Sequence, residues 1–329
     1  MFKDISPVKN IWLDCDPGHD DVMAILMAAF HPEICLLGVS TVAGNQSVEK
    51  TCANARAVLA AVGKADVEVF RGQASALLSP MPFCAEIHGE SGLDGPDGKV
   101  LFQHVALPSE EQFWLPAVYE RIMMAYGESG DRVWLVCTGS LTNAALLLSL
   151  YPSLKSCIQI SLMGGALGIG NTGAVAEFNI QNDPEAAKIV FESGVPICMV
   201  PLELTHQVLA DSDVLISIGE SSAFRRKIRD LLLFFQQTYR DVFGFEHPPL
   251  HDPLAVFYVV RPELFTLKSM RVDIECGSTL SRGQTVCDFY MRSGLPANAD
   301  VALETDVAAF WKEMLECLVR AESEYERWE

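Results

Sequence analysis

Short apolar runs alternate along the chain with segments of helical periodicity. The run at 35–42 is largely apolar, which is typical of a strand buried on both faces of a parallel sheet. After an earlier run, apolar residues recur at Val22, Ile25 and Leu26, the spacing of one helix face. Strands that alternate with helices predict an α/β fold, an open, mostly parallel, Rossmann-like sheet with helices on both faces. The predicted strands are 11–13, 35–42, 67–70, 133–137, 158–163 and 197–200.

The later part of the chain is mainly helical. Residues 270–305 alternate in the manner of antiparallel strands, and 310–325 have an amphipathic helical pattern. We therefore expect one domain over 1–329 with a small antiparallel element near its C-terminus. Two segments, 71–112 and 240–250, interrupt the rhythm, and the sequence leaves open whether they close over a substrate as lids.

Composition narrows the range of partners. The formal net charge of −19 argues against nucleic acids and anionic membranes, because both are bound through basic patches. The ten cysteines include no CxxC pair, which favours buried, reduced thiols in a reducing compartment. We expect neither a signal peptide nor a membrane span, because no apolar run reaches about 18 residues. The expectation is a cytoplasmic protein.

Four acidic residues lie within eight positions, at Asp14, Asp16, Asp20 and Asp21. The first two share one face of the first predicted strand, and the other two open the helix that follows. Carboxylates held this close repel one another, and a hard divalent cation with oxygen ligands, Ca²⁺ or Mg²⁺, would relieve the repulsion. In the alternative interpretation, Asp20 and Asp21 only cap the helix and Asp14 faces solvent. Capping needs one acid rather than four, which favours the metal.

Further polar residues follow the other predicted strands. Ligands of open α/β sheets bind in the crevice at the carboxyl ends of the strands, so we expect these residues to line one crevice with Asp16 and Asp20. They are Asn45, Thr138, Gly164, Asn171, Glu177 and Asn179. Singly, the asparagines are more typical of turns than of ligands.

Taken in order, these motifs resemble those of the nucleoside hydrolases, also called nucleoside N-ribohydrolases, of the inosine-uridine-preferring or purine nucleosidase type. The resemblance covers about residues 11–290 and is far more specific than an isolated DxDPG. Its motifs are DCDPGHDD at 14–21, GNQ at 44–46, HGE at 88–90, TG at 138–139, LMGG at 162–165, AEFN at 176–179 and HDP at 251–253.

The resemblance implies a homo-oligomer, a dimer or tetramer, whose subunit binds one Ca²⁺. The metal would be held by Asp16, both oxygens of Asp21, the Thr138 carbonyl and Asp252. The ribose hydroxyls would be bound by Asp20, Asn45, Asn171, Glu177 and Asn179, with Met163 beneath the sugar. His251 and His88 would face the nucleobase, with His251 as the leaving-group acid.

Hydrolysis of a ribonucleoside passes through an oxocarbenium-like sugar and needs a nucleophile, charge stabilisation and a proton for the leaving base. A calcium-bound water would attack, and because calcium acidifies water weakly, we assign Asp16 as the general base. His251 titrates near neutrality and can protonate the base. His88 and His247 stay open as alternatives, and without the resemblance His251 would be interpreted as a helix-flanking residue.

Aromatic side chains that could stack on a two-ring base favour inosine or guanosine as the substrate. They are Phe178, Tyr239, Phe243, Phe245 and His247, of which Phe178, Tyr239 and His247 are expected to bind substrate. Uridine stays an alternative, because 240–250 is where the chain departs most from the family's pattern. The expected role is purine or pyrimidine salvage.

Two other classes of function use similar features. A phosphatase of the haloacid dehalogenase type also has a DxD after its first strand, but it needs a lysine for the phosphate, and no lysine follows a mid-sheet strand here. A nucleoside phosphorylase is disfavoured for the same reason. A non-catalytic nucleoside-binding protein would retain ribose contacts without the metal or base, yet Asp16, Asp21 and Asp252 are all present.

Overall fold

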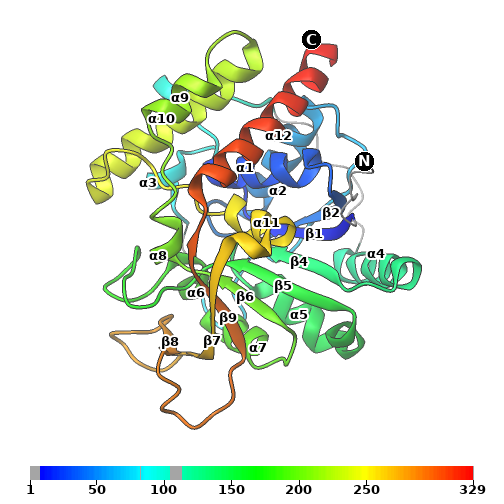
Figure 1. Ribbon diagram of the computed structural model, residues 1–329, viewed down its shortest axis with the longest axis vertical. Coiled ribbons are helices and arrows are strands. Elements are labelled where there is room, and N and C mark those ends of the chain that lie inside the picture. The colour runs from blue at the N-terminus through cyan, green and yellow to red at the C-terminus, as the bar shows by residue number, and fades with distance from the viewer. Residues whose placement is uncertain (1–7, 82, 104–112, 329) are drawn as a thin grey trace.

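The computed structural model describes residues 8–81, 83–103 and 113–328. Within these residues, nine strands form one sheet in the order β3-β2-β1-β4-β5-β6-β9-β7-β8 (Figure 1). The strands are β1 (Lys9–Cys15), β2 (Ile34–Thr41), β3 (Val69–Arg71), β4 (Val133–Cys137), β5 (Ile158–Met163), β6 (Ile197–Val200), β7 (Phe265–Ile274), β8 (Thr285–Asp288) and β9 (Ala299–Thr305).

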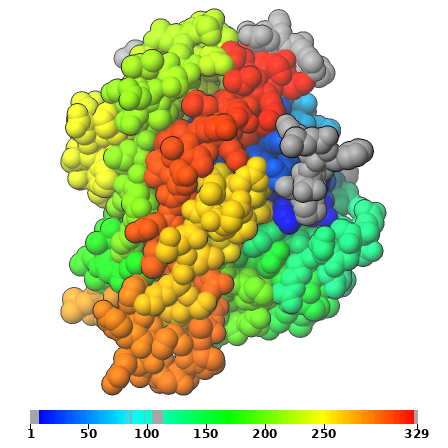
Figure 2. All heavy atoms as spheres, in the orientation of Figure 1, coloured from blue at the N-terminus to red at the C-terminus, as the bar shows by residue number. Residues whose placement is uncertain are grey.

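The sheet is mostly parallel. Strands β1 to β6 pair in parallel with their neighbours, and β9 continues in parallel beside β6. Only β7 runs antiparallel, to β9 on one side and to β8 on the other, among the described strands. The predicted α/β class with an antiparallel C-terminal element is therefore confirmed. That element is continuous with the main sheet, and the chain around β8 projects from the lower end of the molecule (Figure 2).

Helices cover both faces of the sheet (Figure 1). On one face α1 (His19–Phe30) packs against α11 (Pro253–Val260) and α12 (Val307–Trp328), and on the other α5 (Thr142–Leu150) packs against α7 (Pro184–Phe191). The remaining helices are α2 (Val48–Ala61), α3 (Ala85–His88), α4 (Trp114–Ser129), α6 (Phe178–Asn182), α8 (Leu202–Thr205), α9 (Ser212–Ile218) and α10 (Ala223–Phe243), with 3-10 turns at Pro96–Gly98, Pro152–Ser156 and Pro262–Leu264.

Helix α11 lies wholly in the interior. All eight of its residues are buried, as expected for a helix that is apolar on every side. It contacts α1 and β5, and the Ser161 hydroxyl of β5 donates a hydrogen bond to the Ala255 carbonyl at 2.7 Å. This packing fixes the position of Asp252, the residue that precedes the helix.

Helix α1 begins directly after β1. The strand ends at Cys15, the chain turns through Pro17 and Gly18, and Asp21 in the first helical turn accepts a hydrogen bond from the Gly18 N–H at 3.0 Å. Because α1 and α11 pack together, their acidic N-terminal residues meet beside the end of β1. Helix N-termini carry partial positive charge, which favours acids there.

The two segments that interrupt the sequence pattern have different structures. The described part of 71–112 contains α3 and a 3-10 turn, whereas residue 82 and residues 104–112 lie outside the described residues. Helix α10 extends to Phe243 and ends where Gly244 adopts a left-handed φ of 73°. Among the described helices, none has the length and apolar character needed to cross a membrane.

Candidate active site

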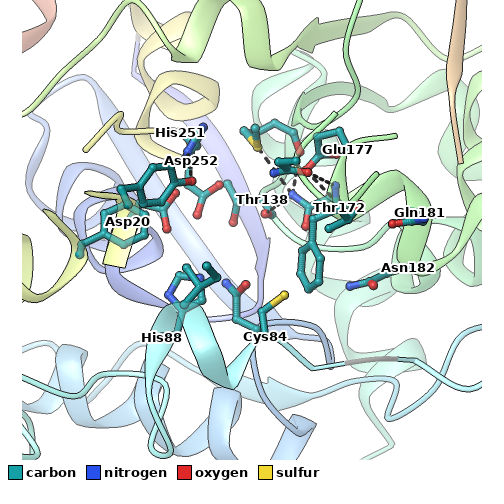
Figure 3. Close-up of a pocket in the computed structure, with 18 of the residues that line it drawn as sticks. Asp20, Cys84, His88, Thr138, Thr172, Glu177, Gln181, Asn182, His251 and Asp252 are labelled. Atoms are coloured by element: carbon teal, nitrogen blue, oxygen red, sulfur yellow. Dashed lines mark hydrogen bonds between the residues drawn. The ribbon is translucent and has the colours of Figure 1, made fainter. Parts of the chain in front are cut away.

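A cavity of about 460 Å³ lies at the carboxyl ends of the central strands (Figure 3). Its wall includes most of the site residues predicted from the sequence. These are Asp20, Asn45, His88, Thr138, Met163, Asn171, Glu177, Phe178, Asn179, Tyr239, His251 and Asp252. The size is in the range of small-molecule sites.

Three carboxylates meet at this cavity. Asp20, Asp21 and Asp252 each place one oxygen within 4.8 Å of the other two, and all three side chains are buried. Burial raises the pKa of Asp20 to about 7, and repulsion from the charge of Asp21 adds to the rise. Burial and repulsion from Asp20 and Asp21 raise the pKa of Asp252 well above its usual range. A cation among these oxygens would remove the repulsion, so the cluster is suited to hold one.

Asp16 lies beside this cluster with one oxygen unused. Its Oδ2 accepts a hydrogen bond from the Asn45 N–H at 2.8 Å, whereas Oδ1 is buried with no hydrogen-bond partner among the described residues. Glycines stand on both sides, and a Cβ at Gly139 would lie 2.6 Å from Oδ1, while one at Gly44 would collide with Oδ2. Small residues therefore keep space around this carboxylate, whose Oδ1 has no hydrogen-bond partner among the described residues.

Asp21 connects these groups. The Thr138 hydroxyl donates to its Oδ1 at 2.9 Å, and the Asn45 side-chain amide donates to its Oδ2 at 3.2 Å. The Thr138 carbonyl accepts from the Asn179 amide at 2.9 Å. The structure thus brings together the four residues predicted to hold a metal, and it adds Asp20, to which the sequence assigned only ribose contacts.

Asp14 does not face solvent, and that part of the alternative interpretation is wrong. Its side chain is buried and accepts hydrogen bonds from the Ser40 hydroxyl and, at 2.8 Å, from the Asn143 amide. The capping interpretation has some basis for Asp21, which bonds to the N-cap residue of α1, but capping does not account for the other acids.

Glu177 and Asn179 form the next part of the wall. Glu177 caps α6, accepting from the Asn179 N–H at 2.9 Å, and its other oxygen accepts from the Gly165 N–H at 2.8 Å. Burial raises its pKa to about 7, although backbone donors oppose the rise. The side-chain Oδ1 of Asn171 accepts a hydrogen bond from the Phe178 N–H at 2.9 Å. The loop after β5 is thereby ordered by its own polar side chains.

His251 and Tyr239 also line the cavity, with His251 on the side of Asp252 (Figure 3). The ring of His251 lies between two hydroxyls, with Nδ1 2.7 Å from Thr205 Oγ1 and Nε2 2.6 Å from Tyr239 Oη. Burial lowers the pKa of His251 to about 3, so the ring is neutral at pH 7. Burial also raises the pKa of Tyr239, so its hydroxyl stays protonated. The pair can therefore offer a hydroxyl proton to a ligand.

His88 is held in place by contacts with His19. Its Nδ1 lies 3.2 Å from the His19 backbone N and 3.1 Å from the His19 ring nitrogen, and both rings stack against Phe235. His19 is held in turn by the Asp94 carbonyl at 2.8 Å. His88 therefore presents a constrained ring edge to the cavity.

His247 is not among the described residues that line the cavity. The chain turns at Gly244, and the His247 ring lies 3.2 Å from the Gln236 amide. Phe245, the other aromatic of this turn, packs against Tyr239 from outside the wall. Of the aromatic residues predicted to stack on a base, those that line the cavity are therefore Phe178 of α6 and Tyr239 and Phe243 of α10.

Sequence reasoning missed several residues of the wall. Their side chains come from α3 and the segment before it, from the loop after β5, and from α6 and α10. They are Phe83, Cys84, Ile87, Thr172, Gln181, Asn182, Phe235 and Val242. The available signal was the position of Gln181 and Asn182, which lie two and three residues beyond Asn179 on a short helix before Asp183-Pro184.

Comparisons with known proteins agree with this geometry. Residues 11–312 match the family model described as inosine-uridine preferring nucleoside hydrolase. The chain is 44% identical over 320 residues to a probable ribonucleoside hydrolase of Dictyostelium discoideum, covering 94% of each chain. It is 42% identical over 307 residues to the pyrimidine-specific ribonucleoside hydrolase RihA of Shewanella sp. (strain ANA-3), covering 92% of this chain and 93% of that protein. The solved structure of a purine-preferring ribonucleoside hydrolase from Gardnerella vaginalis superimposes with a TM-score of 0.86 at 30% identity, covering 96% of this chain and 100% of that one. The chain belongs to the nucleoside hydrolase family.

Proposed function

We propose that this protein hydrolyses the N-glycosidic bond of ribonucleosides, releasing ribose and the free base, with Ca²⁺ as its metal. One observation carries the proposal. Buried carboxylates of Asp20, Asp21 and Asp252 meet at a cavity whose wall also carries the Tyr239 and His251 pair. A sugar diol suits the first group, and a leaving base suits the second.

The donor set fits calcium. Asp16, Asp21, the Thr138 carbonyl and Asp252 offer only oxygen, the ligand type that Ca²⁺ prefers, and Asp16 Oδ1 is buried without a partner among the described residues. The Thr138 carbonyl already accepts from Asn179 and has a second lone pair. When bound, calcium would orient water and the ribose diol together.

Asp16 is the general base of the proposal. Its unpartnered oxygen can accept a proton from the attacking water, while the Asn45 N–H holds the other oxygen in place. A positioned base contributes roughly 10²–10⁴-fold to rate. The carboxylate of Glu177, on the same wall, would favour the positive charge that develops on the sugar.

We assign protonation of the leaving base to Tyr239 and His251 acting together. The tyrosine hydroxyl donates its proton to the leaving base, the imidazole 2.6 Å away orients that hydroxyl, and the phenolate regains a proton from solvent as Asp16 releases the proton taken from the attacking water. His247, one of the alternative acids, is off the described cavity wall, whereas His88 would orient the base by its edge.

Both uridine and inosine are proposed as substrates, with uridine at least as good. Two of the aromatic groups behind the predicted purine preference, Phe245 and His247, are not in the described wall. The relative at 42% identity is named pyrimidine-specific, and the solved neighbour at 30% is named purine-preferring. Homo-oligomer formation and a cytoplasmic role in nucleoside salvage remain proposals supported by the family resemblance.

The testing experiment is a panel of inosine, guanosine, adenosine, uridine and cytidine assayed for released base and ribose, with and without a chelator. We expect turnover of uridine and inosine that is lost on chelation and restored by Ca²⁺. Calorimetric binding without turnover would instead favour the non-catalytic alternative. Cleavage of p-nitrophenyl phosphate would support a phosphatase, although no lysine or arginine is among the described lining residues.

A further inference from the structure

Thr205, the last residue of α8, contacts the ring nitrogen of His251 that Tyr239 does not. Its Oγ1 lies 2.7 Å from His251 Nδ1, whereas Tyr239 Oη lies 2.6 Å from Nε2 of the same ring. Thr205 is fully buried and outside the described cavity wall. The three polar groups form one chain of hydrogen bonds, and the direction of donation along it determines whether Tyr239 has a proton to offer a ligand.

This chain of hydrogen bonds can run in two directions, because a neutral imidazole has one N–H. In one direction Thr205 donates to Nδ1 and Nε2–H donates to the Tyr239 oxygen, so the phenol hydrogen is available to a ligand. In the other direction Nδ1–H donates to Thr205 and the Tyr239 hydroxyl donates to Nε2, so the phenol hydrogen is used within the wall. The first direction is the one that supplies a proton to a leaving base.

The distances around the Thr205 hydroxyl favour the first direction. Its alternative acceptor is the Leu202 carbonyl at 3.2 Å, beyond the usual range of about 2.5–3.0 Å for an O–H···O bond. That carbonyl already accepts from the His206 N–H at 2.9 Å. His251 Nδ1, at 2.7 Å, is the nearer acceptor and is therefore the one to which the hydroxyl donates.

Neighbouring residues of α8 fix the position of Thr205. The Leu202 N–H donates to the Gly165 carbonyl at 3.0 Å, and the Glu203 carboxylate accepts from the Leu167 N–H at 2.8 Å. The first two residues of this one-turn helix are thus bound to the loop after β5. Because Thr205 itself is buried, its hydroxyl is held against the imidazole, as a positioning group must be.

The Tyr239 end of the chain of hydrogen bonds lies among the carboxylates of the cavity. Burial raises the pKa of Tyr239, and the charges of Asp20, Asp252 and Glu177 add to the rise, so its hydroxyl is close to these groups. A phenol oxygen that accepts from Nε2–H keeps its own hydrogen for another acceptor. Once that hydrogen has been donated, the Nε2–H bond stabilises the phenolate.

We propose that Thr205 is a positioning residue of this enzyme, which keeps the hydrogen of His251 on Nε2 and so directs the Tyr239 proton to the leaving base. The inference rests on the proposed function, in which Tyr239 protonates the base. Thr205 lies outside the described cavity wall, so it acts through His251. Loss of its hydroxyl should therefore weaken proton donation and leave the metal and ribose contacts in place.

The experiment compares Thr205→Val, which has a similar shape without the hydroxyl, with Thr205→Ser, which keeps a hydroxyl. T205V should lower kcat for uridine and inosine by about tenfold with little change in KM, the effect of one lost hydrogen bond, and T205S should stay within about threefold of wild type. With p-nitrophenyl riboside, whose leaving group needs no proton, T205V should match wild type within about threefold. The control is Thr238→Val, which should keep wild-type activity, because the Thr238 hydroxyl donates to the Phe234 carbonyl of its own helix at 3.1 Å.

A second measurement locates the hydrogen directly. In protein with isotope-labelled histidine, nitrogen NMR separates protonated from unprotonated ring nitrogens, and the signals lost in His251→Ala identify His251. We expect hydrogen on Nε2 alone in the wild type. The Nδ1 resonance should move in T205V, which lacks the donor to that nitrogen, and should stay unchanged in T238V.

Several outcomes overturn the role of Thr205. These are hydrogen on His251 Nδ1 in the wild type, unchanged kcat for nucleosides in T205V, equal losses on nucleosides and p-nitrophenyl riboside, and a T205S variant as impaired as T205V. The wild-type spectrum needs no variant, so it tests the inference even where T205V does not fold. A wild type that leaves every nucleoside intact contradicts the proposed function instead, and the spectrum, which needs no turnover, still tests the position of the hydrogen.

Discussion

The carboxylate cluster of the cavity and its aromatic wall, called here the acidic end and the base end, are built from different parts of the fold. The acidic end takes Asp20, Asp21 and Asp252 from the N-termini of two packed helices, α1 and α11, beside the end of a central strand. The base end takes its aromatic residues from α10 and from the chain around α3, outside the sheet. The carboxylates are thus held by the core, whereas the aromatic wall comes from peripheral elements. In the proposed function, selectivity for the base would reside in those elements, which can vary without loss of the fold.

The largest expected effect is at the acidic end. Replacing Asp16 with alanine removes the proposed base and should lower kcat roughly 10²–10⁴-fold for every nucleoside. The assay is ribose release, and circular dichroism checks the fold. Asp66→Ala, at an exposed position away from the cavity, is the matched control and should retain full activity. Full turnover by Asp16→Ala refutes the mechanism.

The second effect separates the two ends. Tyr239→Phe and His251→Ala should each lower kcat for inosine by about 10²-fold, because the base then leaves without a proton. With p-nitrophenyl riboside, whose leaving group needs no proton, both variants should stay within about tenfold of wild type. Asp16→Ala should fail on both substrates. Equal losses of both variants on the two substrates would mean that the pair has no role as an acid.

The third effect is a pH dependence of stability without metal. Asp20 and Glu177 have folded-state pKa values raised to about 7, from usual values of 3.8 and 4.5. Between about pH 4 and 7 the folded chain keeps protons that the unfolded chain has released, so stability falls as pH rises, on the order of 1 kcal/mol per group per pH unit. Melting curves in chelator should show this decline, and saturating Ca²⁺ should remove the part that comes from Asp20 while leaving the part that comes from Glu177. A decline that is identical with and without Ca²⁺ would argue against metal binding.

The smallest expected effects test which aromatic residues of the base end contact the substrate. Phe243→Ala removes an aromatic ring of the wall and should raise KM for inosine by a few-fold, as one ring contact is worth about 0.5–1.5 kcal/mol. His247→Ala should change KM by less than twofold. A larger effect for His247 than for Phe243 would show that the turn after α10 closes over bound substrate.

The sequence predicted the acidic end well because its signal is local. Asp14 lies near the end of β1, and Asp16, Asp20 and Asp21 follow that strand. The rule that ligands bind at strand ends leads to Thr138 and Glu177. The position of Asp252 came from the family resemblance. Its structural cause, the buried helix α11, could be recognised as apolar but not located against α1 without the tertiary packing.

The base end was predicted less well because its residues are set by long-range contacts. His247 and Phe245 have the right chemistry, but a left-handed turn at Gly244 directs that segment away from the described wall. Conversely, His88 is oriented by His19, 69 positions earlier in the chain, and His251 is contacted by Thr205, 46 positions earlier. Neither relation has a periodicity or motif that sequence could reveal.

The complete burial of α11 has a consequence for the thermal inactivation of this protein. A helix with no solvent-facing side cannot loosen independently, because any displacement would expose apolar surface on all sides. Asp252 should therefore keep its position until the whole chain unfolds. Thermal inactivation should coincide with cooperative melting of the whole chain rather than precede it.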